Sequence, residues 1–160
     1  RKSKLAKKDT PMLPVIKDAV NFFEKNNGNY IVSEVVIFDP TSPLRKNKDI
    51  NEAFKLFKRK KPDLLVSANH SSHNPYFSML EKKGNYYQLS KNPHKNPGSR
   101  QKANIVYEIN TIVWIYSRKA IFKLKKRIPK NTLIFKTPRE RSIDIDNYED
   151  IIKIKNYLKN

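Results

Sequence analysis

The chain has 160 residues, which suits one domain, and its 34 basic and 15 acidic side chains give a formal net charge of +19. Apolar residues make up 38% of the chain, and they recur in clusters, which argues against disorder. The lack of Cys excludes a disulfide scaffold, a zinc ribbon and a thiol enzyme. No apolar run approaches the roughly 20 residues that cross a membrane, so we expect no membrane partner and a cytoplasmic setting.

The positive charge raises the question of a nucleic-acid partner, because phosphate contacts dominate such binding. The composition argues against it, since Lys, Asn and Ile together make up 59 of the 160 residues and a coding bias toward them explains the excess. The Lys residues are also spread along the whole chain. We therefore expect no nucleic-acid partner and keep a basic nucleic-acid-binding domain as an alternative.

The first half of the chain predicts a helix, a strand, a second helix and a second strand. Apolar residues recur at helical spacing over Thr10–Lys25 and Asp49–Arg59, and short apolar runs predict strands at Glu34–Phe38 and Leu64–Ala68. A strand, a helix and another strand in this order form a βαβ unit, which implies a parallel sheet. Ligands of such sheets bind beyond the carboxyl ends of the strands, where the loop Asp39–Arg45 lies.

The second half begins with a polar, Pro-rich and Asn-rich stretch at 90–100 among short possible strands, which predicts a hairpin or an arm. The possible strands are Phe77–Leu80, Tyr86–Leu89 and Asn104–Tyr107. Farther along, we expect strands at Thr111–Tyr116 and Thr132–Phe135, a short helix at Arg118–Lys125 and a closing helix at Asn147–Leu158. The expected fold is therefore α/β with a mostly parallel sheet and a projecting arm.

Asp144 and Asp146 are the sharpest chemical feature of the sequence. In an extended segment, alternate side chains share a face about 6.5–7 Å apart, so both carboxylates can reach one cation while Ile143 and Ile145 point inward. Mg²⁺ is often held by one or two carboxylates, with water and phosphates completing its coordination. Alternatively, Asp146 caps the last helix with Glu149 as its capping-box partner, a role that leaves Asp144 unexplained.

Two further groups of polar residues are candidate binding sites. The first is a strand-end loop whose hydroxyls and guanidinium suit an anionic or hydroxyl-rich ligand: Asp39, Thr41, Ser42 and Arg45. The second contains an Arg that can bind a carboxylate with two hydrogen bonds: Arg100, Gln101, Tyr107 and Asn110. The alternatives are a proline-stiffened turn for the first group and a solvated arm for the second.

Taken together, the motifs resemble the acylneuraminate cytidylyltransferases, or CMP-sialic acid synthetases, from Arg1 to about Leu158. The pieces that match in the family's order are Leu5, Ala6, Asp9 and Thr10, DPTSPLR at 39–45 with Asp49 and Ile50, NPYFSMLE at 74–81, Arg100–Gln101, YEIN at 107–110 and RSIDID at 141–146. The resemblance implies a Rossmann-like nucleotide-diphospho-sugar transferase (GT-A-like) fold, with an arm near residues 70–110 that forms a homodimer.

The resemblance also implies a reaction in which CTP is joined to a nine-carbon 2-keto sugar acid and pyrophosphate is released. Asp144 and Asp146 would then bind Mg²⁺ and act in catalysis, while Ser42, Arg45 and Arg100 would orient the sugar or its carboxylate. The other substrate-binding residues would be Asp39, Thr41, Gln101, Tyr107 and Asn110. A non-catalytic remnant that dimerises or regulates is the alternative.

The sequence departs from the family pattern in two respects. The family opens with a strand and a basic RxGSKxxxxKN loop that holds the CTP triphosphate, and nothing here matches it. The chain thus resembles the C-terminal two thirds of the enzyme, a partial cytidylyltransferase domain over residues 1–160. Sialic-acid-specific members often carry Gln where Asp39 stands and Arg where Glu108 stands, so we expect another nonulosonate, such as a legionaminate or pseudaminate.

Overall fold

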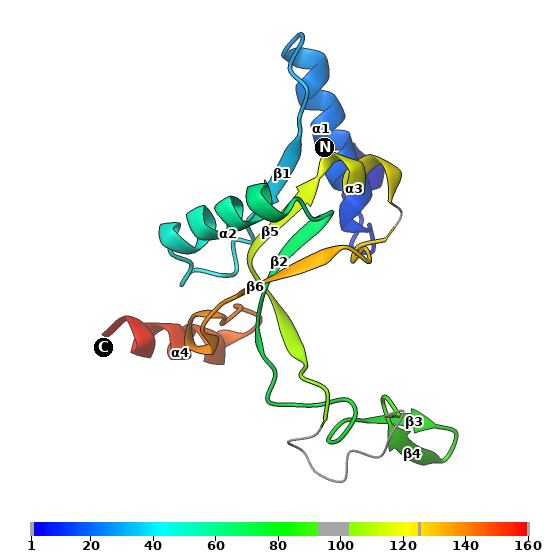
Figure 1. Ribbon diagram of the computed structural model, residues 1–160. Helices are drawn as coiled ribbons and strands as arrows, with labels where there is room; N and C mark the ends of the chain where they lie inside the picture. Colours follow the sequence, from blue (N-terminus) through cyan, green and yellow to red (C-terminus); the bar gives the residue numbers. More distant parts are fainter. Residues whose placement is uncertain (1, 93–102, 125, 160) are drawn as a thin grey trace.

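The computed structural model describes residues 2–92, 103–124 and 126–159, which form an α/β body and a projecting arm (Figure 1). The helices in these ranges are η1 (Ser3–Leu5), α1 (Met12–Asn26), α2 (Asn47–Lys60), α3 (Arg118–Lys123), η3 (Arg139–Arg141) and α4 (Tyr148–Lys159). The strands there are β1 (Glu34–Ile37), β2 (Leu64–His70), β3 (Leu80–Lys83), β4 (Tyr86–Leu89), β5 (Tyr107–Ser117) and β6 (Thr132–Lys136).

The central sheet has the strand order β1-β5-β2-β6 and is mixed. β2 pairs in parallel with β6, whereas β5 runs antiparallel to both of its neighbours, with Ile115 opposite Val36 on one side and Leu65 on the other. β1, β2 and β6 share one direction, as the βαβ unit predicts. The expectation of a mostly parallel sheet is nevertheless wrong for the pairing, because β2 leads out into the arm and β5 returns beside it in the opposite direction.

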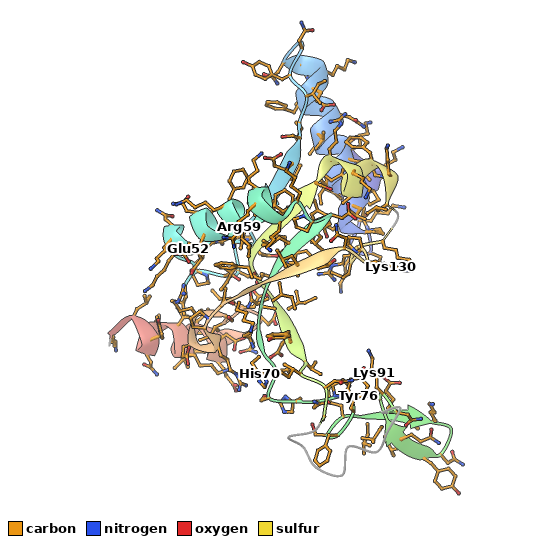
Figure 2. The ribbon with its side chains drawn as sticks, viewed as in Figure 1. Glu52, Arg59, His70, Tyr76, Lys91 and Lys130 are labelled. Atoms are coloured by element: carbon orange, nitrogen blue, oxygen red, sulfur yellow. The ribbon has the colours of Figure 1, made fainter. Side chains whose placement is uncertain are left out.

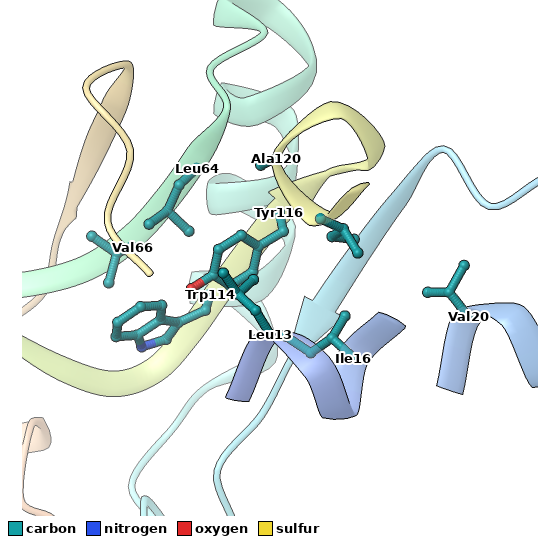
Figure 3. Close-up of a cluster of buried hydrophobic side chains, with 9 residues drawn as sticks. Leu13, Ile16, Val20, Leu64, Val66, Trp114, Tyr116 and Ala120 are labelled. Atoms are coloured by element: carbon teal, nitrogen blue, oxygen red, sulfur yellow. The ribbon is translucent and has the colours of Figure 1, made fainter. Parts of the chain in front are cut away.

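Helices cover both faces of the sheet because β2 and β5 are apolar on both faces. Figure 3 shows one face, where α1 and α3 pack on Leu64, Val66, Trp114 and Tyr116. The intervening positions turn the other way and meet α2: Leu65, Val113 and Ile115 pack against Ala53 and Phe57. The result is a three-layer arrangement in which residues 64–69 of β2 and 112–116 of β5 are buried.

The arm extends from the carboxyl end of β2 and carries the antiparallel hairpin of β3 and β4 away from the sheet (Figure 1). The expected strand Tyr86–Leu89 is confirmed. The expected strand Phe77–Leu80 is wrong except at its last residue, because the Asn74 carbonyl accepts hydrogen bonds from the backbone N–H of Phe77 (3.0 Å) and of Ser78 (2.7 Å), which closes a turn.

The other expected strand of the arm, Asn104–Tyr107, overlaps β5 only at Tyr107.

Near the start of the arm, Lys91 Nζ lies 5.6 Å from the centre of the Tyr76 ring (Figure 2). Arg100 and Gln101, with most of the polar stretch at 90–100, lie outside the described residues. Of the helices in the described ranges, none has the length and apolarity to cross a membrane.

Candidate active site

A polar pocket of about 370 Å³ lies at the edge of the sheet where β2 and β6 end. It is lined by Asn69 from β2, by residues 108–111 of β5, and by Arg139, Ser142, Ile143, Asp144 and Asp146 from the segment after β6. β5 enters the sheet at this same edge, so three segments distant in sequence meet there. The pocket therefore lies beyond the carboxyl ends of the parallel strands, where such folds place ligands.

Asp144 and Asp146 both line this pocket. Oδ1 of Asp144 is buried and has no hydrogen-bond partner among the described residues. A buried carboxylate oxygen without a partner is costly unless a ligand satisfies it, so the aspartates fit a divalent cation. Within the described ranges no cluster of three or more His, Cys, Asp or Glu side chains is placed to hold a metal. The pair Asp144 and Asp146 nevertheless suits Mg²⁺, which is often held by one or two carboxylates with water and phosphates as further ligands.

The alternative role of Asp146 as the cap of α4 is taken by its neighbours. Asn147 Oδ1 accepts the backbone N–H of Asp150, and Asp150 Oδ2 accepts the backbone N–H groups of Asp146 and Asn147, each at 3.2 Å. This reciprocal pattern is a capping box one residue later than expected. Hydrogen bonds from Lys153 and these backbone groups hold the pKa of Asp150 below its ordinary value. The Asp146 carboxylate is left to face the pocket.

The segment that carries the two aspartates follows the 3₁₀ turn η3 and belongs to no strand. Ile143 lines the pocket beside Asp144, so the strict alternation of a strand does not describe it. The backbone N–H of Ile145 donates to the Thr41 carbonyl at 2.9 Å. That hydrogen bond joins the aspartate segment to the loop Asp39–Arg45, which the sequence had placed at the same edge of the sheet.

The loop Asp39–Arg45 supports the pocket from outside its lining. Asp39 Oδ1 accepts hydrogen bonds from the backbone N–H (3.3 Å) and Oγ1 (2.8 Å) of Thr41, which close a turn. The Arg45 guanidinium donates to the carbonyls of Asp39 at 2.6 Å, Ser42 at 3.2 Å and Ile112 at 3.1 Å. These contacts match the alternative of a stiffened turn, and binding of substrate by Asp39, Thr41 and Arg45 stays a prediction.

Ser42 is 1% exposed, and its hydroxyl forms a hydrogen bond with the hydroxyl of Thr111, which does line the pocket. Its proposed contact with a sugar is thus at most indirect in this arrangement. Tyr107 also lies outside the lining. The centre of its ring lies 6.2 Å from that of His70, with the two rings nearly perpendicular, and 5.3 Å from Lys136 Nζ. Figure 2 shows His70 at the neck between the sheet and the arm.

Asn110 is the predicted binding residue that the structure buries most deeply at the pocket, with 8% of its side chain exposed. Its Nδ2 lies 3.2 Å from Asn69 Oδ1, 2.8 Å from Thr137 Oγ1 and 3.0 Å from Ser142 Oγ. These contacts join β2, β5 and the segment after β6 beneath the pocket. Such a satisfied polar network holds its members in one geometry.

Sequence reasoning assigned no site role to Asn69 and Arg139, and it treated Glu108 only as a departure from a family pattern; the structure places all three in the pocket lining. Asn69 Nδ2 lies 3.4 Å from Glu108 Oε2. Arg139 is the one cationic side chain among the described lining residues. The available signals were weak: Asn69 is a polar residue that ends an apolar strand, and Arg139 comes shortly before the aspartates.

A buried ion pair joins α2 to the start of the aspartate segment. Arg141 donates to both carboxylate oxygens of Asp49, and Nη2 lies 3.0 Å from Oδ1, with the two side chains 12% and 9% exposed. Burial raises the pKa of Asp49, but hydrogen bonds from Arg141 and the Lys46 backbone outweigh burial, so the pKa lies below its ordinary value. The hydrogen bonds to Asp49 raise the pKa of Arg141. Both groups are therefore charged at neutral pH.

Known proteins of similar sequence cover almost the whole chain, although no family model matches it. The CMP-N,N'-diacetyllegionaminic acid synthase of Campylobacter jejuni is 29% identical over 158 residues, which span 99% of this chain and 66% of the relative. The post-translational flagellin modification protein B of Campylobacter coli is 27% identical over 161 residues, with the same coverage. An N-acylneuraminate cytidylyltransferase of Streptococcus agalactiae is 26% identical over 159 residues, only 37% of its length.

A solved structure gives independent support for the fold. The 4-diphosphocytidyl-2C-methyl-D-erythritol synthase of Anaerococcus prevotii superposes with a TM-score of 0.58 over 88% of this chain and 65% of the other, at 15% identity. The chain therefore shares the α/β fold of this synthase, and it spans about two thirds or less of the length of its relatives. Over nearly its whole length it is homologous to the acylneuraminate cytidylyltransferases and CMP-legionaminic acid synthases, as its motifs predicted.

Proposed function

We propose that the chain carries the cation-binding and sugar-binding part of a cytidylyltransferase that joins CTP to a nonulosonic acid. One observation carries this proposal: Asp144 and Asp146 line one pocket, and a buried oxygen of Asp144 lacks a protein partner among the described residues. Amides, hydroxyls and Arg139 form much of the remaining lining, which suits a polar, anionic substrate. The names of the relatives support the substrate class.

In the proposed reaction, the anomeric hydroxyl oxygen of the sugar bonds to the α-phosphorus of CTP as the bond to pyrophosphate breaks, and the hydroxyl proton passes to solvent. A bound Mg²⁺ would supply neutralisation of the phosphate charge. Asp144 and Asp146 would hold the ion, and Arg139 would bind a phosphate or the sugar carboxylate. Asn110 would keep the pocket floor rigid through its hydrogen bonds.

Glu108 supports a nonulosonate other than N-acetylneuraminate as the substrate. Its carboxylate lines the pocket together with Asp144 and Asp146, so this side of the pocket repels a carboxylate and accepts hydrogen bonds from N–H or O–H groups. All nonulosonates offer such donors, so the choice among them rests on Glu108 standing where sialic-acid-specific members often carry Arg, and on the name of the legionaminic acid relative. The arm near residues 70–110 would form the homodimer, and exposed apolar side chains on its hairpin, such as Leu80 (62%) and Tyr86 (77%), fit that role.

The test is release of pyrophosphate from CTP and Mg²⁺ with N-acetylneuraminate, a diacetyllegionaminate or a pseudaminate. The assay uses this chain joined to the family's strand and RxGSKxxxxKN loop, because the sequence has nothing that matches that loop. We expect release with one of the latter two sugars, loss of release without Mg²⁺, and loss in Asp144→Asn and Asp146→Asn. Asp18→Asn is the matched control, because Asp18 pairs with Lys2 on the surface of α1. Unchanged activity in either pocket variant, or no release with any of the sugars, would contradict the proposal.

A further inference from the structure

The ion pair of Asp49 and Arg141 lies behind the pocket without lining it. We propose that it is a positioning pair: it fixes the segment that carries Asp144 and Asp146 so that both carboxylates address one cation. This inference rests on the proposed function, because the cation site is part of that proposal. It assigns to Asp49 and Arg141 a role in binding without contact with the ligand.

The geometry of Asp49 makes it a fixed anchor. It lies in the first turn of α2, where its backbone N–H donates to the Lys46 carbonyl at 2.9 Å and its Oδ2 accepts the Lys46 backbone N–H at 3.2 Å. The helix itself is held to the sheet by Ala53 and Phe57. A carboxylate fixed at both its backbone and its side chain offers the Arg141 guanidinium one orientation, since a pair of parallel hydrogen bonds is directional.

Arg141 is three residues before Asp144, so its bonds to Asp49 fix the start of the segment that leads into the pocket. The residues from Ser142 to Asp146 belong to no helix or strand, so their path depends on individual contacts. These contacts include the Ser142 hydroxyl with Asn110 and Thr137, the Ile145 N–H with the Thr41 carbonyl, the Asp146 N–H with Asp150, and the ion pair at Arg141. Of these, the ion pair is the one made by two charged side chains.

The charge of Arg141 is a second reason to expect that the ion pair affects cation binding. With Asp49 present, the guanidinium of Arg141 is occupied at both of its terminal nitrogens. Without the Asp49 carboxylate, a buried guanidinium would be left uncompensated three residues before Asp144 in the chain, and we expect it to compete with a cation for the pocket carboxylates. Loss of either partner therefore displaces the segment and weakens cation binding. Loss of Asp49 also weakens it through competition, because the Arg141 guanidinium remains.

The experiment is a Mn²⁺ titration of the whole chain, with the free ion measured by electron paramagnetic resonance. We expect Asp49→Asn and Arg141→Gln each to raise the Kd for Mn²⁺ roughly tenfold or more, as loss of outer-shell partners does in metal sites. The double variant should bind Mn²⁺ about as well as Arg141→Gln and no more weakly than Asp49→Asn, because the one ion pair is lost in all three and the competing guanidinium is absent from the double variant. Arg141→Lys, which keeps the charge, should fall between the parent and Arg141→Gln.

Glu24→Gln is the matched control, because Glu24 and Arg118 form another pair with two hydrogen bonds, between α1 and the start of α3. It should lower the melting temperature and leave the Kd unchanged. Mn²⁺ binding by Asp49→Asn as tight as in the parent would overturn the positioning role while leaving the proposed site intact. A Kd raised equally by Glu24→Gln would assign the effect to general destabilisation, and absence of Mn²⁺ binding in the parent would overturn both proposals.

Discussion

Replacement of Asp144 by Ala should make the metal-free chain more stable. Oδ1 of Asp144 is buried without a partner among the described residues, and an unsatisfied buried polar group costs about 1–3 kcal/mol. Asp144 as a whole is only half-buried, so we take the lower end and expect a gain of about 1 kcal/mol in the free energy of unfolding. For a chain of this length that gain raises the melting temperature by about 2–4 °C.

A divalent cation should reverse the order of stability and make the parent more stable than Asp144→Ala. At a Mn²⁺ concentration a hundredfold above Kd, the parent gains about 2.7 kcal/mol from binding, and a variant without the site gains nothing. The assay is thermal unfolding of parent and variant in a chelator and in Mn²⁺. Asp146→Ala is the control, since its exposed carboxylate should give the same loss of Mn²⁺ stabilisation without the metal-free gain. A metal-free Asp144→Ala chain that is less stable than the parent would refute the reasoning.

Three further predictions concern the fold around the site. Leu65→Ala, at a side chain with 0% exposure, should cost about 2–5 kcal/mol in urea unfolding; a cost under about 1 kcal/mol would contradict the packing. Asn110→Ala should cost about 1–3 kcal/mol by the same assay, because its hydrogen-bond partners are left buried, and a neutral effect would argue against the network. Because folding lowers the pKa of Asp49, its ionised carboxylate stabilises the folded chain above the ordinary value of 3.8, and that stabilisation is lost as pH falls below it. The free energy of unfolding should therefore fall less steeply with decreasing pH in Asp49→Asn than in the parent. An equally steep fall in both would contradict the ion pair.

The order of elements could be predicted because apolar periodicity reports burial directly. β1, α2 and β2 follow the expected βαβ unit within a few residues, since their apolar positions face the two layers of helices. The antiparallel direction of β5 could not be read in the same way. A run such as Ile112 to Ile115 is buried on both faces in either direction, so its pattern carries no information about which way the strand runs.

The sequence could place candidate residues in one pocket where a single short segment carries them, and it missed lining residues that distant segments supply. Asp144 and Asp146 share a pocket because they are two residues apart. Asn69 and Arg139 reach the same pocket only through the pairing of β2 with β6, a long-range fact that local sequence does not contain. The polar groups of Arg45 and Ser42 are engaged within the protein, which only the fold reveals, and their role in binding a substrate stays a prediction.

Binding of a divalent cation at Asp144 and Asp146 is the central claim, and direct measurement of bound Mn²⁺ tests it most simply. Equilibrium dialysis of the parent chain should show one ion per chain that Mg²⁺ displaces, and Asp144→Asn and Asp146→Asn should each abolish that binding while they remain folded. No bound ion in the parent, or equal binding in both variants, would contradict the account.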